Sequence, residues 1–121
     1  MSAIFCHFNF NVLDLKRSVE FYDKALGLRE ARRVEGDGFT LVYLTDGVTP
    51  FELELTYLFD RKERYDLGED EFHLAMRVKD YKAAHALHEK MGCVCFENTE
   101  MGLYFIEDPD GYWIEVIPAK R

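Results

Sequence analysis

The sequence predicts an α+β fold built from two tandem βαβββ modules, and three observations lead to this prediction. First, the chain repeats itself: HFNFNVLDLKRSVEFYDKALG, which starts at His7, returns as HLAMRVKDYKAAHALHEKMG from His73. Second, each copy has the pattern of a strand, a helix and then short strands separated by turn residues. Third, 121 residues with a 48% hydrophobic share are enough for one compact domain with its own core.

The repeat keeps a constant spacing through the strand and most of the helix. The matched positions are His7 with His73, Val12 with Val78, Asp14 with Asp80, Lys16 with Lys82 and Lys24 with Lys90. Gly27 corresponds to Gly92 after a deletion of a single residue. We therefore expect a single domain over 1–121, with module one at about 1–59, a linker at 60–70 and module two at about 71–121.

Module one begins with a strictly alternating segment. Cys6, Phe8, Phe10 and Val12 point to one side, and His7, Asn9 and Asn11 point to the other. This pattern predicts a half-buried strand whose polar face looks into a cleft. Asp14 is placed to cap a helix over 15–26, and Gly27 is placed to end it in a left-handed conformation. Strands are expected at 29–35, 39–45 and 51–59, with turns at 35–38 and 45–50.

Module two follows the charged segment 60–71, which has no apolar periodicity. A strand over 71–78 places His73, Ala75 and Arg77 on one face. Asp80 is expected to cap a helix over 81–91 that ends at Gly92, with His85 and His88 at the surface. Three strands at about 93–97, 103–107 and 112–118 complete the chain, and the DPDG segment at 108–111 makes the last turn.

Charge and hydropathy exclude several classes of protein. The net charge of −8 argues against binding to nucleic acid or anionic membranes, because both need a basic face. No apolar run approaches the roughly 20 residues of a membrane span, and the first residues lack a signal-peptide pattern. We expect a cytoplasmic protein. The three cysteines, Cys6, Cys93 and Cys95, are interpreted as buried free thiols in a reducing compartment.

Four residues at equivalent places in the repeat form a candidate metal site. Glu54 and Glu115 each interrupt a hydrophobic strand, where an unpaired carboxylate is costly to bury. Taken alone, each of them can also be a glutamate on the solvent side of an amphipathic strand. Together with His7 and His73 they offer two imidazoles and two carboxylates, a set suited to nickel, cobalt, zinc, iron or manganese. The modules are therefore expected to form a curved mixed sheet around a metal-binding cleft.

The same residues resemble a known family. The opening HxxxxVxDLxRSxxFYxxxLG pattern, the ELTY strand, the DPDGYWIE ending and the His/Glu/His/Glu quartet are similar to glyoxalase I of the vicinal oxygen chelate superfamily. The likeness covers essentially the whole chain. Related branches differ at the metal positions, and a glutamate within ELTY is typical of glyoxalase I.

The resemblance implies a lactoylglutathione lyase that isomerises the methylglyoxal–glutathione hemithioacetal to S-lactoylglutathione, a step in methylglyoxal detoxification. A metal ion held by His7, Glu54, His73 and Glu115 would stabilise an enediolate. Glu115 would act as the principal base, with Glu54 as its catalytic partner on the opposite face. Short bacterial chains of this family prefer nickel or cobalt, so nickel is expected here, with zinc as a further alternative. The family also implies a homodimer.

Two positions depart from the family pattern for glutathione. Asn11 stands where many members carry an arginine that anchors a carboxylate, and Leu58 replaces a family asparagine. Asn11 is still expected to contact the substrate from this position. By the repeat, Arg77 corresponds to Asn11 and is a candidate to bind the anionic tail, although it can instead pair with an acidic neighbour. Met101 is the candidate lid contact. The alternatives are an isomerase or thiol transferase of the same superfamily acting on another thiol or small substrate, and a non-catalytic small-molecule-binding module.

Overall fold

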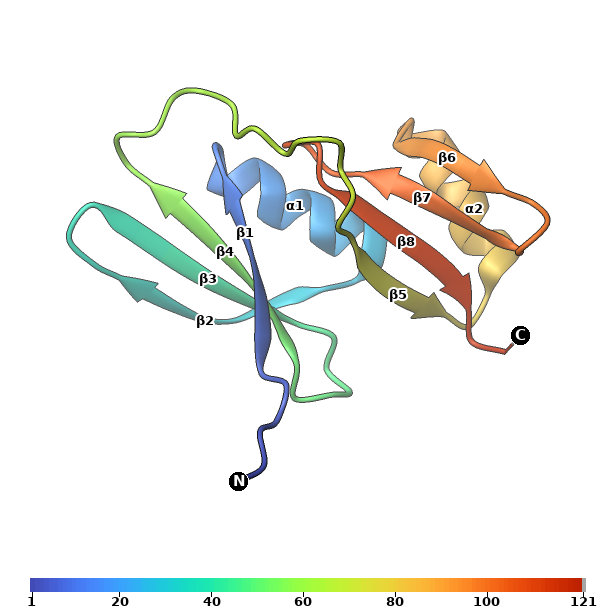
Figure 1. Ribbon diagram of the computed structural model, residues 1–121, viewed down its shortest axis with the longest axis horizontal. Coiled ribbons are helices and arrows are strands. Elements are labelled where there is room, and N and C mark those ends of the chain that lie inside the picture. Colours follow the sequence, from blue (N-terminus) through green and yellow to red (C-terminus); the bar gives the residue numbers. More distant parts are fainter. Residues whose placement is uncertain (121) are drawn as a thin grey trace. The chain divides into compact units, whose positions relative to one another are not determined.

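The computed structural model describes residues 1–120 and divides the chain into two compact units, Met1–Tyr65 and Asp66–Arg121. Each unit contains a four-stranded sheet and one long helix (Figure 1). In both units the order along the chain is one strand, the helix and three further strands. The predicted α+β fold class of tandem βαβββ modules is therefore confirmed.

The first unit contains β1 (His7–Val12), α1 (Leu15–Leu26), β2 (Arg29–Glu35), β3 (Phe39–Thr45) and β4 (Glu52–Leu58). Its strands are arranged in the order β1-β4-β3-β2. The pair β1–β4 is parallel, and β3 is antiparallel to both β4 and β2. The first strand therefore crosses back to lie beside the last one.

The second unit repeats this topology with β5 (Leu74–Val78), α2 (Tyr81–Met91), β6 (Val94–Asn98), β7 (Leu103–Glu107) and β8 (Trp113–Pro118). Its sheet order is β5-β8-β7-β6, and β5 is parallel to β8. The antiparallel pairs are β6–β7 and β7–β8. The two units thus share the same mixed-sheet plan.

Both helices begin and end where the sequence predicts. The Asp14 carboxylate accepts a hydrogen bond from the backbone N–H of Arg17, and Asp80 does the same for Ala83. At the other ends Gly27 and Gly92 adopt left-handed conformations with φ of 68° and 72°. An L side chain rarely adopts this conformation, so glycine ends each helix at low cost.

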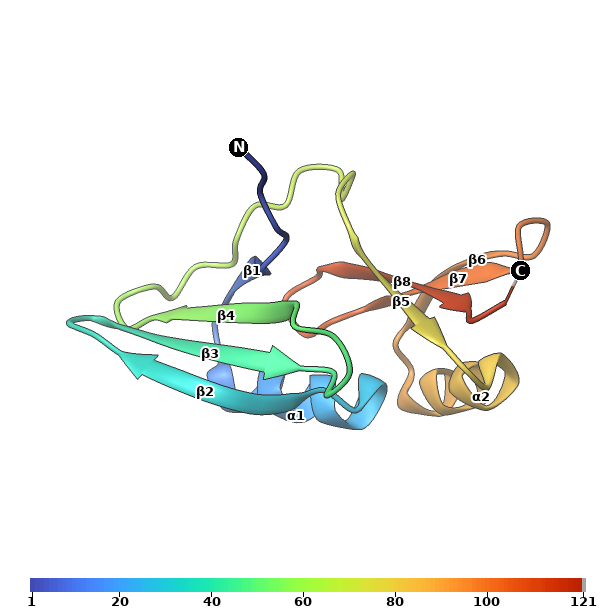
Figure 2. The same cartoon turned by 90° about the horizontal axis from the view of Figure 1, so that it is seen from below.

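The core of the first unit lies on one face of its sheet, where α1 covers it (Figure 2). The β1 alternation is confirmed for its inner residues: Phe10 and Val12 are buried, whereas His7 and Asn9 are exposed. Fully or almost fully buried side chains from the other elements complete this core, namely Tyr22, Val42, Leu44, Leu53 and Leu55. The opposite face of the sheet carries His7 and Asn9 of β1 together with Glu54 of β4.

The core of the second unit contains a histidine that the sequence analysis placed at the surface. His88 is fully buried, and its Nδ1 lies 2.7 Å from the hydroxyl of Tyr104. Burial raises the pKa of Tyr104, so the phenol stays protonated, and the contact with Nδ1 satisfies the polar group of each buried side chain. The prediction for His88 was wrong because helical periodicity alone does not distinguish a buried, paired imidazole from an exposed one.

Some strand boundaries also differ from the prediction. The strand expected at 71–78 is shorter, so His73 lies directly before β5, and the strand expected at 93–97 begins and ends one residue later. The cysteines are free, but Cys6 and Cys95 are exposed and Cys93 is only half-buried, which corrects the expectation of buried thiols. Among residues 1–120, the helices are too short or too polar to span a bilayer.

Candidate metal centre

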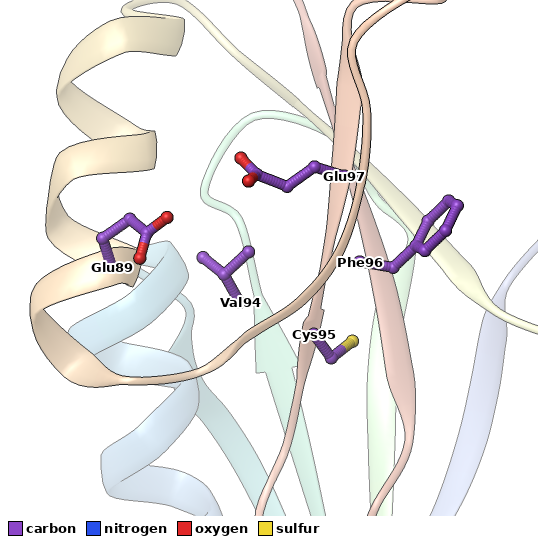
Figure 3. Close-up of a pocket in the computed structure, with 5 residues that line it drawn as sticks. All are labelled: Glu89, Val94, Cys95, Phe96 and Glu97. Atoms are coloured by element: carbon purple, nitrogen blue, oxygen red, sulfur yellow. The ribbon is translucent and has the colours of Figure 1, made fainter.

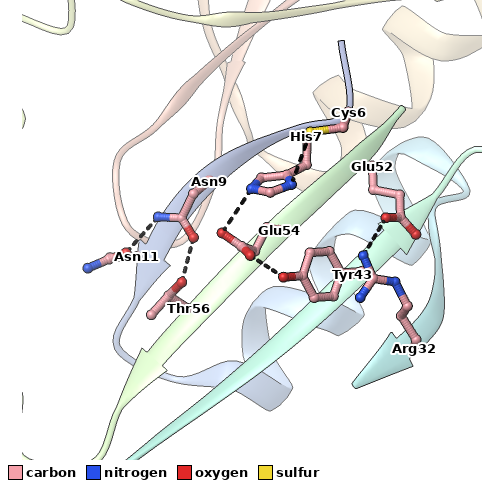
Figure 4. A network of polar contacts seen from close by, with 9 residues as sticks. All are labelled: Cys6, His7, Asn9, Asn11, Arg32, Tyr43, Glu52, Glu54 and Thr56. Carbon is pink, nitrogen blue, oxygen red and sulfur yellow. Dashed lines mark hydrogen bonds and ion pairs between the residues drawn. The ribbon is translucent and has the colours of Figure 1, made fainter. Parts of the chain in front are cut away.

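The first candidate ligand pair lies on the parallel strands of the first unit. In the β1–β4 register Asn9 lies opposite Glu54, and His7 precedes Asn9 on the same face. The Nε2 atom of His7 is 3.5 Å from Oε1 of Glu54 (Figure 4). The imidazole side chain is 38% exposed and the carboxylate 13%, so the pair is open to an incoming ion on the histidine side.

The second candidate pair occupies the equivalent place in the second unit. Ala75 lies opposite Glu115 in the parallel β5–β8 pair, and His73 precedes Ala75. The Nε2 atom of His73 is 3.0 Å from Oε1 of Glu115, and the two side chains are 37% and 18% exposed. The repeat seen in the sequence is therefore also a repeat of side-chain geometry.

An aromatic residue on the neighbouring antiparallel strand supports each pair. Tyr43 of β3 lies opposite Glu54, and Phe105 of β7 lies opposite Glu115. Each histidine ring meets this aromatic ring edge-on, with centroids 5.8 Å apart for His7 and 5.0 Å apart for His73. Edge-to-face contact restrains the imidazole orientation and leaves Nε2 directed at the glutamate.

The two glutamates nevertheless have different surroundings. The hydroxyl of Tyr43 donates a short hydrogen bond to Oε2 of Glu54, and this bond raises the pKa of Tyr43 (Figure 4). The Arg32 guanidinium lies 3.6 Å above the Tyr43 ring and bonds to Glu52 over 2.9 Å. Phenylalanine cannot supply a hydroxyl at the equivalent place beside Glu115. Glu54 therefore has a hydroxyl partner on the neighbouring strand that Glu115 lacks, whereas Glu115 has the shorter contact to its histidine.

Each pair has the separation that a shared metal ion requires. Two donors about 2.0–2.2 Å from one ion in tetrahedral or octahedral geometry lie roughly 2.8–3.6 Å apart. The observed nitrogen–oxygen distances of 3.5 Å for His7–Glu54 and 3.0 Å for His73–Glu115 lie within this range. The residues in both pairs therefore fit a divalent transition metal.

The predicted substrate contacts lie at different places within their units. The side chains of Asn11 and Asn9 are in polar contact over 2.7 Å, on the face that carries His7 (Figure 4). Arg77 is exposed on β5 and lies opposite Ile117, which is the position equivalent to that of Asn11 in the first sheet. Met101 is 59% exposed in the turn between β6 and β7, where its N–H donates to the Asn98 side chain.

The sequence analysis did not identify Tyr43 and Arg32 as part of this polar network. A usable signal was present, because strand alternation places Tyr43 on the face opposite to the apolar Val42 and Leu44. The sequence does not give the register between β3 and β4, and it is this register that places Tyr43 directly beside Glu54.

Comparison with known proteins identifies the family of this chain. Residues 4–116 match the model of the Glyoxalase/Bleomycin resistance protein/Dioxygenase superfamily. A lactoylglutathione lyase of Neisseria meningitidis is 38% identical over 94% of this chain and 89% of its own length. The chain belongs to this superfamily, in its glyoxalase I family. A second lactoylglutathione lyase, from Haemophilus influenzae, is 36% identical over 94% of this chain and 91% of its own length.

A solved structure agrees with this family assignment. The trypanothione-dependent glyoxalase I of Leishmania major superposes with a TM-score of 0.87 at 33% identity, covering 98% of this chain and 88% of that one. The chain is thus a glyoxalase I-like enzyme of the lyase and isomerase class. The sequence resemblance to glyoxalase I is confirmed.

Proposed function

We propose that this glyoxalase I-like enzyme is a metal-dependent lactoylglutathione lyase that converts the methylglyoxal–glutathione hemithioacetal to S-lactoylglutathione. The observation that carries the proposal is the recurrence of one His/Glu geometry in both units, with separations of 3.5 Å and 3.0 Å. The names of the Neisseria and Haemophilus relatives support the substrate and product.

The proposed metal ligands are His7, Glu54, His73 and Glu115. Two imidazoles and two carboxylates suit borderline divalent ions, and nickel is the proposed ion, with cobalt and zinc as the other candidates. When bound, the ion supplies Lewis-acid stabilisation of the negative charge that develops on the substrate oxygens. The histidine rings are restrained by Tyr43 and Phe105, so little reorganisation is needed for binding.

The proton transfer is assigned to Glu115. Its carboxylate takes the proton from the substrate carbon bonded to sulfur and returns it to the neighbouring carbon, acting first as a base and then as an acid. Glu54 is less free to move because the Tyr43 hydroxyl holds its Oε2. Phe105 leaves Glu115 without such a hydroxyl, which suits a group that must turn toward the substrate.

We further propose a cytoplasmic homodimer that binds no nucleic acid. The net charge of −8 supports the last point, because a phosphate backbone attracts basic surfaces. Each unit has its own core and its own ligand pair, so a complete set of four ligands can be drawn from one chain or from two. Two-fold homodimers are also the commonest oligomers among soluble proteins.

The proposal is tested with metal-stripped protein reconstituted separately with nickel, cobalt and zinc. Isomerisation of the methylglyoxal–glutathione hemithioacetal should be absent from the stripped protein and should return with the metal, most strongly with nickel. Stoichiometric metal binding without turnover on glutathione would reject this substrate. The same protein would then be assayed with trypanothione, the thiol named for the Leishmania relative.

Two inactive variants identify the source of the ligands. His7→Ala/Glu54→Ala and His73→Ala/Glu115→Ala are mixed, dissociated and allowed to reassociate. If ligands from two chains form each site, a mixed dimer has one intact site, and random exchange should restore about a quarter of the wild-type activity. No recovery, despite exchange demonstrated with labelled chains, indicates that each site is made within one chain.

Arg77 is proposed to bind the anionic tail of the thiol in place of the family arginine. It is exposed on β5 at the position equivalent to Asn11, which cannot carry that charge. Because a charge-assisted contact to an exposed group contributes modestly, Arg77→Ala should raise KM roughly tenfold and leave kcat nearly unchanged. Initial-rate kinetics over a range of hemithioacetal concentrations measure both constants.

Lys82→Ala provides the matched control for Arg77→Ala. Lys82 is an exposed cation on α2, so its removal lowers the net charge by the same amount. A KM that rises equally in both variants would point to a general electrostatic effect, and an unchanged KM in Arg77→Ala would remove this residue from the substrate contacts.

A further inference from the structure

A second group of metal-ligating side chains lies in the second unit, outside the proposed quartet. His85 and Glu89 are one turn apart on α2, and Glu97 is on the edge strand β6. The Nε2 atom of His85 is 2.5 Å from Oε1 of Glu97 and 3.5 Å from Oε1 of Glu89. Their ligand atoms all lie within 4.8 Å of one another.

The fold places these three side chains together and restrains the histidine. Residues four apart on a helix share a face, so His85 and Glu89 both project toward β6. The His85 ring meets Tyr104 edge-on at 4.8 Å, and Tyr104 is itself fixed by its hydrogen bond to the buried His88. The imidazole orientation therefore rests on a buried aromatic residue.

The space beside this group is open. A hollow of about 370 Å³ is lined by Glu89 of α2 and by four successive residues of β6, Val94, Cys95, Phe96 and Glu97. Figure 3 shows Glu89 pointing from the helix and Glu97 pointing from the strand toward each other across it. An ion held here has room for water molecules at its remaining coordination positions.

We propose that His85, Glu89 and Glu97 form a second site for a divalent transition metal such as zinc. The donor set is one imidazole nitrogen and two carboxylates, and the two negative charges balance the charge of the ion. The observed separation of 3.5 Å is near that of two ligands on one ion, and the 2.5 Å contact opens by about half an ångström as the ion replaces the hydrogen-bonded proton. The exposed glutamate side chains can make this adjustment.

The sheet register separates this site from the proposed active site. Glu97 lies opposite Tyr104, which in turn lies opposite Val116, and this face of the sheet is covered by α2. Glu115 lies opposite Phe105 on the other face. The second ion therefore joins α2 to β6 and takes no part in turnover.

The test is a calorimetric titration of metal-stripped protein with Zn²⁺, read as ions bound per chain. Wild-type protein should bind one ion per chain more than either His85→Ala or Glu89→Gln/Glu97→Gln. Zinc should also raise the melting temperature of wild-type protein more than that of these variants, because ligands that bind only the native state stabilise it. The His85 ring signals in a proton–nitrogen NMR spectrum should shift on saturation.

Controls keep the two sites distinguishable. Glu100→Gln, an exposed glutamate in the β6–β7 turn, should bind zinc like the wild type. His73→Ala should lose zinc binding at the proposed active site, but zinc should still shift the His85 ring signals. The second site can therefore be tested even if the proposed function is wrong. Equal zinc stoichiometry and affinity in wild type and His85→Ala, with circular dichroism showing a folded variant, would overturn it and leave only an ion pair between the histidine and the glutamates.

Discussion

Glu115→Gln should lower kcat for hemithioacetal isomerisation by about 10²–10⁴-fold, the range expected when a general base is removed. Glutamine retains a carbonyl oxygen that can remain near the proposed metal ion, but it cannot accept and return a proton at the catalytic pH. The substitution changes neither the volume of the side chain nor its place on β8. The loss should therefore fall on kcat, which steady-state kinetics on the nickel-loaded enzyme measures directly.

The two glutamates have different aromatic neighbours, and this difference leads to a second expected result. Tyr43 donates to Glu54, whereas Phe105 stands at the equivalent place beside Glu115. Tyr43→Phe removes this hydrogen bond and preserves the ring against His7. We expect it to lower kcat only a few-fold, because a positioning contact is lost and the base is retained.

Glu20→Gln is the control for Glu115→Gln, because it removes an exposed carboxylate from α1 and should leave kcat unchanged. Metal content must be measured in every variant. A nickel-loaded Glu115→Gln enzyme with near wild-type kcat would assign the proton transfer elsewhere, and a much larger loss in Glu54→Gln would assign it to the first unit.

Asp108→Ala should lower the free energy of unfolding by about 2–4 kcal/mol. The side chain is 4% exposed, and its Oδ1 accepts hydrogen bonds from the backbone N–H groups of Asp110 and Tyr112, each at 2.9 Å. Alanine leaves both donors without this acceptor in a buried turn, and each buried unpaired group costs about 1–3 kcal/mol. Urea denaturation of the two proteins provides the comparison.

Asp108→Asn separates the hydrogen bonds from the charge. The amide keeps an oxygen at the acceptor position, so most of the stability lost in the alanine variant should return. The turn leads directly into β8, which carries Glu115. A less ordered turn should therefore misplace Glu115, and Asp108→Ala should also reduce activity. Equal stability of the alanine variant and the wild type would show that other groups in the turn replace the lost acceptor.

Much of the fold was predictable because local and repeated signals agree. Asp14 and Gly27 mark the ends of α1 by capping chemistry, and Asp80 and Gly92 do the same for α2. The His/Glu pairings were anticipated from the repeat alone. That expectation depended on equivalent positions, which a sequence shows directly, and did not require knowledge of strand order.

The features that escaped prediction depend on contacts between distant elements. His88 is buried because Tyr104, on β7, offers it a hydroxyl, and helical spacing contains no information about that partner. Tyr43 reaches Glu54 only through the β3–β4 register. The group of His85 with Glu97 likewise depends on how β6, which follows α2 after Gly92, lies along that helix, and helical spacing alone does not give this.

The parallel pairing of the first and last strands in each unit has a consequence for folding. The antiparallel strands β2, β3 and β4 follow one another and can associate locally. In contrast, β1 pairs with β4, which lies far along the chain, so this pairing closes a longer loop. His7 lies on β1 and Glu54 lies on β4, so the two residues come together only when these strands pair. A metal ion that needs both His7 and Glu54 would bind only to chains in which β1 has paired with β4, so metal binding would stabilise this pairing.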